Sequence, residues 1–80
     1  MTLTLEILSP TVTRIVEGVE AVFVPGASGA FEVLPRHAAI ISLLVEGDVR
    51  WRVAGVEESM RVKGGVMRMK DNRIQICAEL

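Results

Sequence analysis

Cysteine and histidine each occur only once among the 80 residues of this sequence. The single cysteine, Cys77, excludes an internal disulfide, and with one histidine the chain lacks the ligands of a structural zinc site. We therefore expect a reducing compartment, no metal site and no cofactor. Nine Lys and Arg against ten Asp and Glu leave a net charge of −1. Because this charge creates no long-range field, neither nucleic acid nor an anionic membrane is expected as a direct ligand.

The sequence also has no long apolar run. None approaches the ~20 residues that a membrane-spanning helix needs, and no basic segment with a following apolar run opens the chain. Helical periodicity, internal repeats and low-complexity segments are missing too. We expect one soluble domain over residues 1–80. Hydrophobic residues make up 50% of it, a large share for so short a chain, which predicts an apolar face left over for a partner.

Alternation of apolar and polar residues predicts β-strands throughout, most clearly in residues 3–7 and 49–53. Turn residues separate these short segments. The pattern predicts an all-β fold, an antiparallel two-sheet β-sandwich or flattened barrel of about 8–10 short strands. The expected strands are residues 3–7, 11–17, 19–24, 30–34, 38–45, 49–53, 56–63, 66–70 and 73–78.

Three local features carry more specific expectations. Residues 38–45 form a nearly continuous apolar run, which favours a strand buried on both faces. Gly18 is expected to turn the chain. Gly64-Gly65 indicates a bulge or a close approach of two backbones.

The loop after residue 24 is the least strand-like part of the sequence. Pro25-Gly26 suits the central positions of a type II turn, because proline presets φ and glycine accepts φ > 0. Gly29 permits a second bend. Pro35 then ends the next strand because it has no N–H for the ladder. The glycines could expose N–H groups to a phosphate, but no Lys-Ser/Thr pair and no helix follow, so a phosphate site is not expected.

Other residues allow a functional and a structural interpretation. His37 could act as a base with Glu32 or Asp48, yet no nucleophile motif accompanies it. We therefore favour a corner histidine that is hydrogen-bonded to backbone or to a partner, and no catalytic residue is predicted. Arg50-Trp51-Arg52 could bind nucleic acid, but alternation places both arginines opposite Trp51, which favours a core or interface tryptophan.

The sulfur-containing residues also have a structural interpretation. Met60, Met67 and Met69 could line a binding groove, but ordinary core filling is favoured. Cys77 is expected to be a small buried apolar residue, because no flanking base would activate its thiol.

The loop and the residues after it resemble a known family. That family has a Leu-Pro-Gly-x-x-Gly-x-Phe-Gly-Val-Leu-Pro-x-His-Ala-Pro pattern, and residues 62–76 resemble its second signature, a glycine pair followed by a hairpin. Glu32 and Ala39 depart from the pattern, where glycine and proline are usual. Its matching residues are Pro25, Gly26, Gly29, Phe31, Val33, Leu34, Pro35, His37 and Ala38. The chain is thus similar to the N-terminal domain of the epsilon subunit of F-type ATP synthases, the delta subunit of mitochondria.

The resemblance implies a function and a location. It implies a non-catalytic central-stalk (rotor) subunit that links the gamma subunit to the membrane c-ring and couples ion flow to ATP synthesis. Such a chain would lie peripherally at the cytoplasmic face of the energy-transducing membrane and meet the membrane only through the complex. The chain ends at Leu80, where the family's C-terminal helical hairpin would begin. We therefore expect no inhibitory arm and no bound nucleotide.

The resemblance also implies two sets of contact residues. Gamma contacts are expected at Ser9, His37 and Ser42. The c-ring contacts are expected at Gly26, Ala27, Ser28, Gly29, Ala30, Phe31 and Glu32. Glu32 is the only acidic side chain of this loop, and we expect it to supply an electrostatic contact. The alternative function is a free-standing β-sandwich adaptor or ligand-binding module without a rotary partner.

Overall fold

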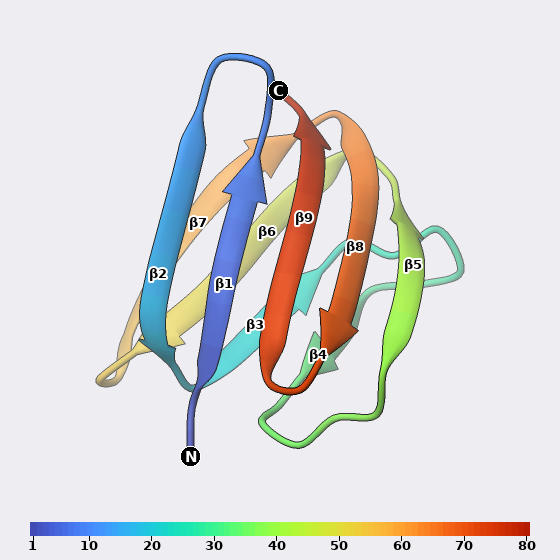
Figure 1. Cartoon of the computed structure of the whole chain (residues 1–80). Coiled ribbons are helices and arrows are strands. Elements are labelled where there is room, and N and C mark those ends of the chain that lie inside the picture. The colour runs from blue at the N-terminus through green and yellow to red at the C-terminus, as the bar shows by residue number, and fades with distance from the viewer.

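The computed structural model describes the whole chain, Met1 to Leu80, as two packed β-sheets without any helix. The strands are β1 (Leu3–Leu8), β2 (Thr13–Val19), β3 (Ala21–Val24), β4 (Phe31–Val33), β5 (Ile40–Leu44), β6 (Gly47–Val53), β7 (Val56–Val62), β8 (Gly64–Lys70) and β9 (Arg73–Glu79). One sheet has five strands in the order β2-β1-β9-β8-β5, and the other has four in the order β4-β3-β6-β7 (Figure 1). The predicted all-β sandwich is confirmed. The chain has no helix with the length and apolarity needed to cross a bilayer.

The five-stranded sheet contains one parallel pair. β1 lies between β2 and β9, antiparallel to the first and parallel to the second, so the first and last strands of the chain lie side by side in one sheet (Figure 1). All other strand pairs are antiparallel.

The core lies between the sheets and consists of 16 buried hydrophobic residues. The β1 sequence shows how alternation builds it, because Leu3, Leu5 and Ile7 face inward and the residues between them face outward. Trp51 is 1% exposed, which confirms its interpretation as a core residue with the flanking arginines outside. Its indole N–H has no hydrogen-bond partner.

Three of the four methionines are core residues. Met67 and Met69 are fully buried in the cluster, and Met60 packs half-buried against it. Their long unbranched side chains fill space between the sheets. The interpretation as core filling, rather than as a binding groove, is confirmed.

The prediction that residues 38–45 are buried on both faces is wrong. Their strand, β5, is the edge of the five-stranded sheet, and only one of its faces meets the core. Ile41 and Leu43 point outward and are 73% and 65% exposed. An edge strand with apolar residues on its outer face has the same sequence pattern as a strand buried on both faces. Both are continuous apolar runs, so the sequence alone does not distinguish them.

The prediction that Cys77 is buried is also wrong. Its neighbours on β9, Ile76 and Ala78, face the core, so alternation turns the Cys77 side chain to the outer face. The thiol is exposed and free.

Gly18 and Gly26 do not occupy the turn positions that the sequence predicted for them. Gly18 has φ 70 inside β2, where the register against β1 shifts, so it forms a bulge and the chain reverses after it. Gly26 does not have positive φ, which a type II turn would require. The turn instead spans Ala27 and Ser28, closed by a 3.0 Å hydrogen bond from the Gly29 N–H to the Gly26 carbonyl.

The expected close approach at the glycine pair is confirmed. Gly65 has φ 153, and a Cβ at this position would collide with the carbonyl of Cys77 on the neighbouring strand. Only glycine lets β8 and β9 pair this closely here.

Candidate functional site

The loop expected to meet the c-ring connects β3 and β4 and is fixed to the other sheet. The Ala27 N–H donates to the Leu43 carbonyl at 2.8 Å, and the Val45 N–H donates to the Pro25 carbonyl at 2.9 Å. Gly26 also forms a bridge with Leu44. These backbone bonds tie a loop of the four-stranded sheet to the edge strand of the five-stranded sheet, so that side of the sandwich is closed.

The residues of this loop divide into a tip and a support. Ala27, Ser28, Gly29 and Ala30 are exposed, small and uncharged, whereas Gly26 is buried. A Cβ on Gly26 would lie 2.8 Å from the Phe31 ring, which is half-buried against the core. Gly26 and Phe31 form the support, and they hold the tip by packing, without a charged contact.

Glu32 lies away from the tip. It sits within β4, exposed, and pairs with Phe23 of β3, which in turn pairs with Arg50 of β6. The Arg50 guanidinium is 4.7 Å from the centre of the Phe23 ring. Glu32 thus belongs to the outer face of the four-stranded sheet.

Ser9 holds the loop between β1 and β2. Its hydroxyl accepts hydrogen bonds from the N–H groups of Val12 at 2.9 Å and Thr11 at 3.3 Å, and its own N–H donates to the Val12 carbonyl. The short loop is therefore closed on itself.

His37 belongs to the corner between β4 and β5. Its N–H donates to the Leu34 carbonyl at 3.1 Å, and Nδ1 lies 2.7 Å from the Ala38 carbonyl oxygen. The interpretation as a corner histidine bonded to backbone is confirmed. The Arg36 N–H donates to Asn72 Oδ1 at 2.6 Å, which ties the corner to the turn between β8 and β9.

Ser42 lies on β5 between two outward apolar residues. Its hydroxyl donates to the Leu43 carbonyl at 3.1 Å, the oxygen that also accepts from Ala27. Its side chain is half-buried on the inner side of the edge, whereas Ile41 and Leu43 face out.

Strand register aligns four residues on the outer face of the five-stranded sheet. Leu8 of β1 pairs with Cys77 of β9. Cys77 pairs with Val66 of β8, which pairs with Leu43 of β5. We call Leu8, Cys77, Val66 and Leu43 the apolar row. No other part of the chain covers this face. A shallow hollow of about 480 Å³ lies over Leu8, Val66 and Cys77 and beside Ser9.

The predicted gamma-contact residues border this face. Ser9 directly follows Leu8 at one end of the apolar row, and Ser42 directly precedes Leu43 at the other. His37 lies in the corner that leads into β5. The three do not form one cluster, but they surround one surface. Sequence reasoning missed the row itself, because its members come from four strands far apart along the chain.

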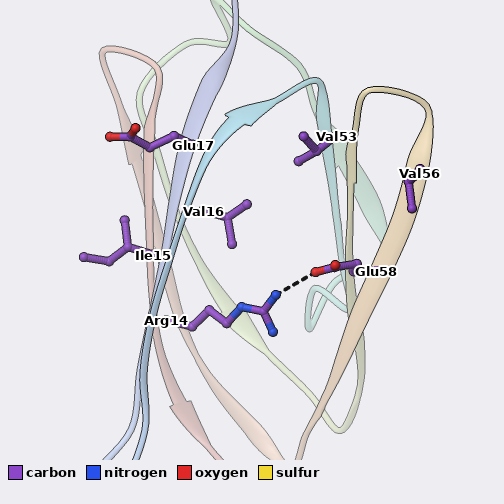
Figure 2. Close-up of a pocket in the computed structure, with 7 residues that line it drawn as sticks. All are labelled: Arg14, Ile15, Val16, Glu17, Val53, Val56 and Glu58. Carbon is purple, nitrogen blue, oxygen red and sulfur yellow. Dashed lines mark hydrogen bonds and ion pairs between the residues drawn. The ribbon is translucent and has the colours of Figure 1, made fainter.

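The opposite side of the sandwich is more open. Between β2 and β7 lies a hollow of about 400 Å³, crossed by Arg14, whose guanidinium pairs with Glu58 at 2.7 Å (Figure 2). The same guanidinium lies 5.4 Å from the Trp51 ring. Figure 2 shows Val16 and Val53 inside the hollow, with Ile15 and Glu17 pointing away from it. No sequence motif indicated this hollow.

The exposed surface of this sandwich includes the apolar row on one sheet face and a loop tied to the edge strand. No three His, Cys, Asp or Glu side chains gather as metal ligands. Residues 2–80 match the family described as ATP synthase, Delta/Epsilon chain, beta-sandwich domain. The chain belongs to this family, and is therefore a non-catalytic component.

Individual relatives agree with this membership. The chain is 36% identical over 78 residues to the ATP synthase epsilon chain of Desulfitobacterium hafniense, covering 98% of this chain and 59% of that one. It is 33% identical over 79 residues to the epsilon chain of Solibacter usitatus, covering 99% of this chain and 59% of that one. The chain thus spans about three fifths of the length of these relatives.

Solved structures share the fold. The central stalk/c-ring of Tetrahymena thermophila mitochondrial ATP synthase contains a similar chain, with TM-score 0.82, 15% identity, and coverage of 100% of this chain and 65% of that chain. A chain in the Euglena gracilis mitochondrial ATP synthase, in its OSCP/F1/c-ring structure, has TM-score 0.88 and 18% identity. The match covers 96% of this chain and 50% of the Euglena chain.

Proposed function

We propose that this chain is a central-stalk rotor subunit that joins the gamma subunit to the c-ring and couples ion flow to ATP synthesis. Family membership supports the proposal, as does the fold shared with a chain of the Tetrahymena central stalk/c-ring structure. In this role the chain lies peripherally at the cytoplasmic face of the membrane and reaches it only through the complex.

The gamma subunit docks on the outer face of the five-stranded sheet. The observation that carries this assignment is the exposed apolar row between Ser9 and Ser42, continued by Ile41 at 73% exposure. Adjoining exposed apolar residues of this kind mark an interaction site on small soluble domains. Aromatic or aliphatic side chains of gamma would cover it, and a stable complex would bury about 1,600 Å² in total.

The c-ring contact uses the loop tip. Its exposed residues, Ala27 to Ala30, are small enough for close approach to polar ring loops. Glu32, exposed on β4 nearby in sequence, supplies the charge that attracts basic ring residues.

A sandwich suits a part that transmits torque. Its two sheets are held by many backbone hydrogen bonds and enclose a closely packed core, so the domain deforms little under load. The tip is also bonded directly to β5, the strand that carries Leu43 in the gamma-facing surface. Force on the loop thus reaches the other surface through backbone alone.

Co-expression with the gamma subunit tests this function. The chain carries an affinity tag, and the mass of the eluted species is measured by light scattering. We expect a 1:1 complex. Recovery of the two proteins as separate species would contradict the proposal and favour a free-standing β-sandwich adaptor.

A further inference from the structure

The two outer faces of the sandwich differ in whether their cationic side chains form ion pairs. On the four-stranded sheet, Arg50 pairs with Glu57 at 3.3 Å and Arg52 with Glu20 at 3.9 Å. Arg61 lies 3.6 Å from Asp48, and also within ion-pair distance of Glu46. The arginines of this face are therefore neutralised within the chain.

On the five-stranded sheet, Arg68, Lys70 and Arg73 have no such partners. None of them lies within 4.0 Å of a carboxylate, and all three side chains are exposed. We call these three residues the cation block. They line a shallow hollow of about 310 Å³ together with Gln75 and Asp71.

The register makes the cation block unfavourable for the isolated chain. Lys70 pairs directly with Arg73 across β8 and β9, and like charges directly opposite each other destabilise a sheet. The nearest outward carboxylate on β1, Glu6, accepts instead from the Gln75 amide at 2.8 Å. Asp71, in the turn between these strands, also lines the hollow but forms no ion pair, so no carboxylate of the chain pairs with the cation block.

The cation block continues the apolar row. Val66, Arg68 and Lys70 are successive outward residues of β8, so about 14 Å of strand joins the row to the far end of the block. Cys77, Gln75 and Arg73 repeat the arrangement on β9. A standard interface, with about 800 Å² on each partner, reaches across both. One occupant of standard size is therefore large enough to cover the apolar and the cationic surface together.

We propose that the partner docking on this face is a protein surface in which an apolar patch is bordered by carboxylates, and that these carboxylates pair with Arg68, Lys70 and Arg73. The proposal rests on the proposed function, since it takes the gamma subunit as that partner. Guanidinium groups bind carboxylates with two hydrogen bonds, so the block fixes orientation as well as attracting the partner. Charge complementarity of this kind raises the association rate and sets the register of docking.

Charge reversal tests the proposal. The double variant Lys70→Glu/Arg73→Glu is compared with the unchanged chain for binding to purified gamma by stopped-flow fluorescence. We expect its association rate constant to fall about tenfold or more at low ionic strength, and the salt dependence of the rate to weaken. The single variant Lys70→Glu is measured as well, with Lys63→Glu as its matched control: Lys63 is an exposed, unpaired lysine directly before β8, and each of the two single changes lowers the net charge by 2. The Lys63→Glu variant should bind at the unchanged rate.

The outcomes separate this inference from the proposed function. Equal rates for the double variant and the unchanged chain, with both binding gamma, would overturn the inference and leave the proposed function standing. If the unchanged chain does not bind gamma, both fall. Vesicles with anionic phospholipids form a further arm. Binding to them that is lost on charge reversal would assign the block to lipid phosphates and overturn the carboxylate pairing. The double variant keeps a like-charge pair at positions 70 and 73, now of two glutamates, so its melting temperature need not rise. A cooperative thermal transition well above the assay temperature shows that it is folded.

Discussion

Ala27 and Leu43 are joined by a 2.8 Å hydrogen bond from the N–H of the first to the carbonyl of the second. Ala27 is an exposed residue of the loop tip, and the Leu43 side chain is part of the apolar row on the other sheet. One backbone bond therefore connects the two surfaces proposed for the c-ring and for gamma. Substitutions of exposed side chains leave this backbone bond in place, so each should weaken the contact with one partner without unfolding the domain.

The first prediction concerns Leu43. A Leu43→Glu variant should bind gamma at least about tenfold more weakly, because a charge replaces an apolar side chain that the interface would bury. Its unfolding free energy should stay within about 0.5 kcal/mol, since the side chain is 65% exposed. Isothermal titration calorimetry measures the affinity. Val56→Glu is the control, because Val56 is 63% exposed on the opposite side of the sandwich; an equal loss there would rule out a specific gamma face.

The second prediction uses the native thiol of Cys77. In the free chain it should react readily with a maleimide, because it is exposed on the outer face. Bound gamma should slow the reaction about tenfold or more, since buried thiols are inert. Mass spectrometry over time gives both rates. Undiminished labelling of the complex would mean that gamma binds elsewhere.

The third prediction concerns Glu32. Glu32→Lys should weaken docking of a reconstituted central stalk to the c-ring, most at low salt, because the contact is electrostatic and exposed. Docking is measured by cosedimentation with ring-containing membranes. Glu17→Lys, at an exposed position on β2, should dock normally. Unchanged docking of Glu32→Lys at low and high salt alike would count against the contact.

The fourth prediction concerns Gly26. A Gly26→Ala variant should lose about 1–3 kcal/mol of unfolding free energy in urea. The added Cβ would lie 2.6 Å from the Gly29 carbonyl oxygen and 2.8 Å from the Phe31 ring. Gly64→Ala is a matched control, because its nearest contact is 3.4 Å. Similar losses in both variants would show that the packing under the loop does not decide stability.

The fifth prediction concerns Arg14, whose guanidinium covers the ring of Trp51. Arg14→Ala should make this single tryptophan more accessible to acrylamide, because the guanidinium lies 5.4 Å from its ring. Stability should fall by about 0.5–1 kcal/mol, the range for an exposed ion pair with a cation–π contact. Glu58→Ala breaks the ion pair but keeps the guanidinium, so its quenching should change less. Equal quenching in the two variants would contradict a covering role for Arg14.

Sequence reasoning predicted the local structure well where one strand decides it. Alternation placed Trp51 inside and its arginines outside, and Gly64-Gly65 predicted a bulge or a close approach of two backbones, of which the structure shows the close approach. It failed where packing against other segments determines whether a residue is buried or exposed. Gly26 is buried by the Phe31 ring rather than placed in a positive-φ turn, and the exposure of Leu43 depends on β5 being an edge.

The candidate site shows the same division. Ser9, His37 and Ser42 were placed by resemblance, and the loop by its prolines and glycines. The apolar row and the cation block could not be predicted, because they depend on which residue of one strand lies beside which residue of another. Leu8 and Cys77 become neighbours only through the pairing of the first strand with the last.

That pairing has a consequence for how the domain is made. β1 needs β9 on one side, so the larger sheet cannot assemble until residue 79 has left the ribosome. During synthesis the early strands expose apolar side chains that the finished core buries, and nascent chains in this state are prone to aggregate or to bind chaperones. The larger sheet is therefore completed only after translation of its last strand.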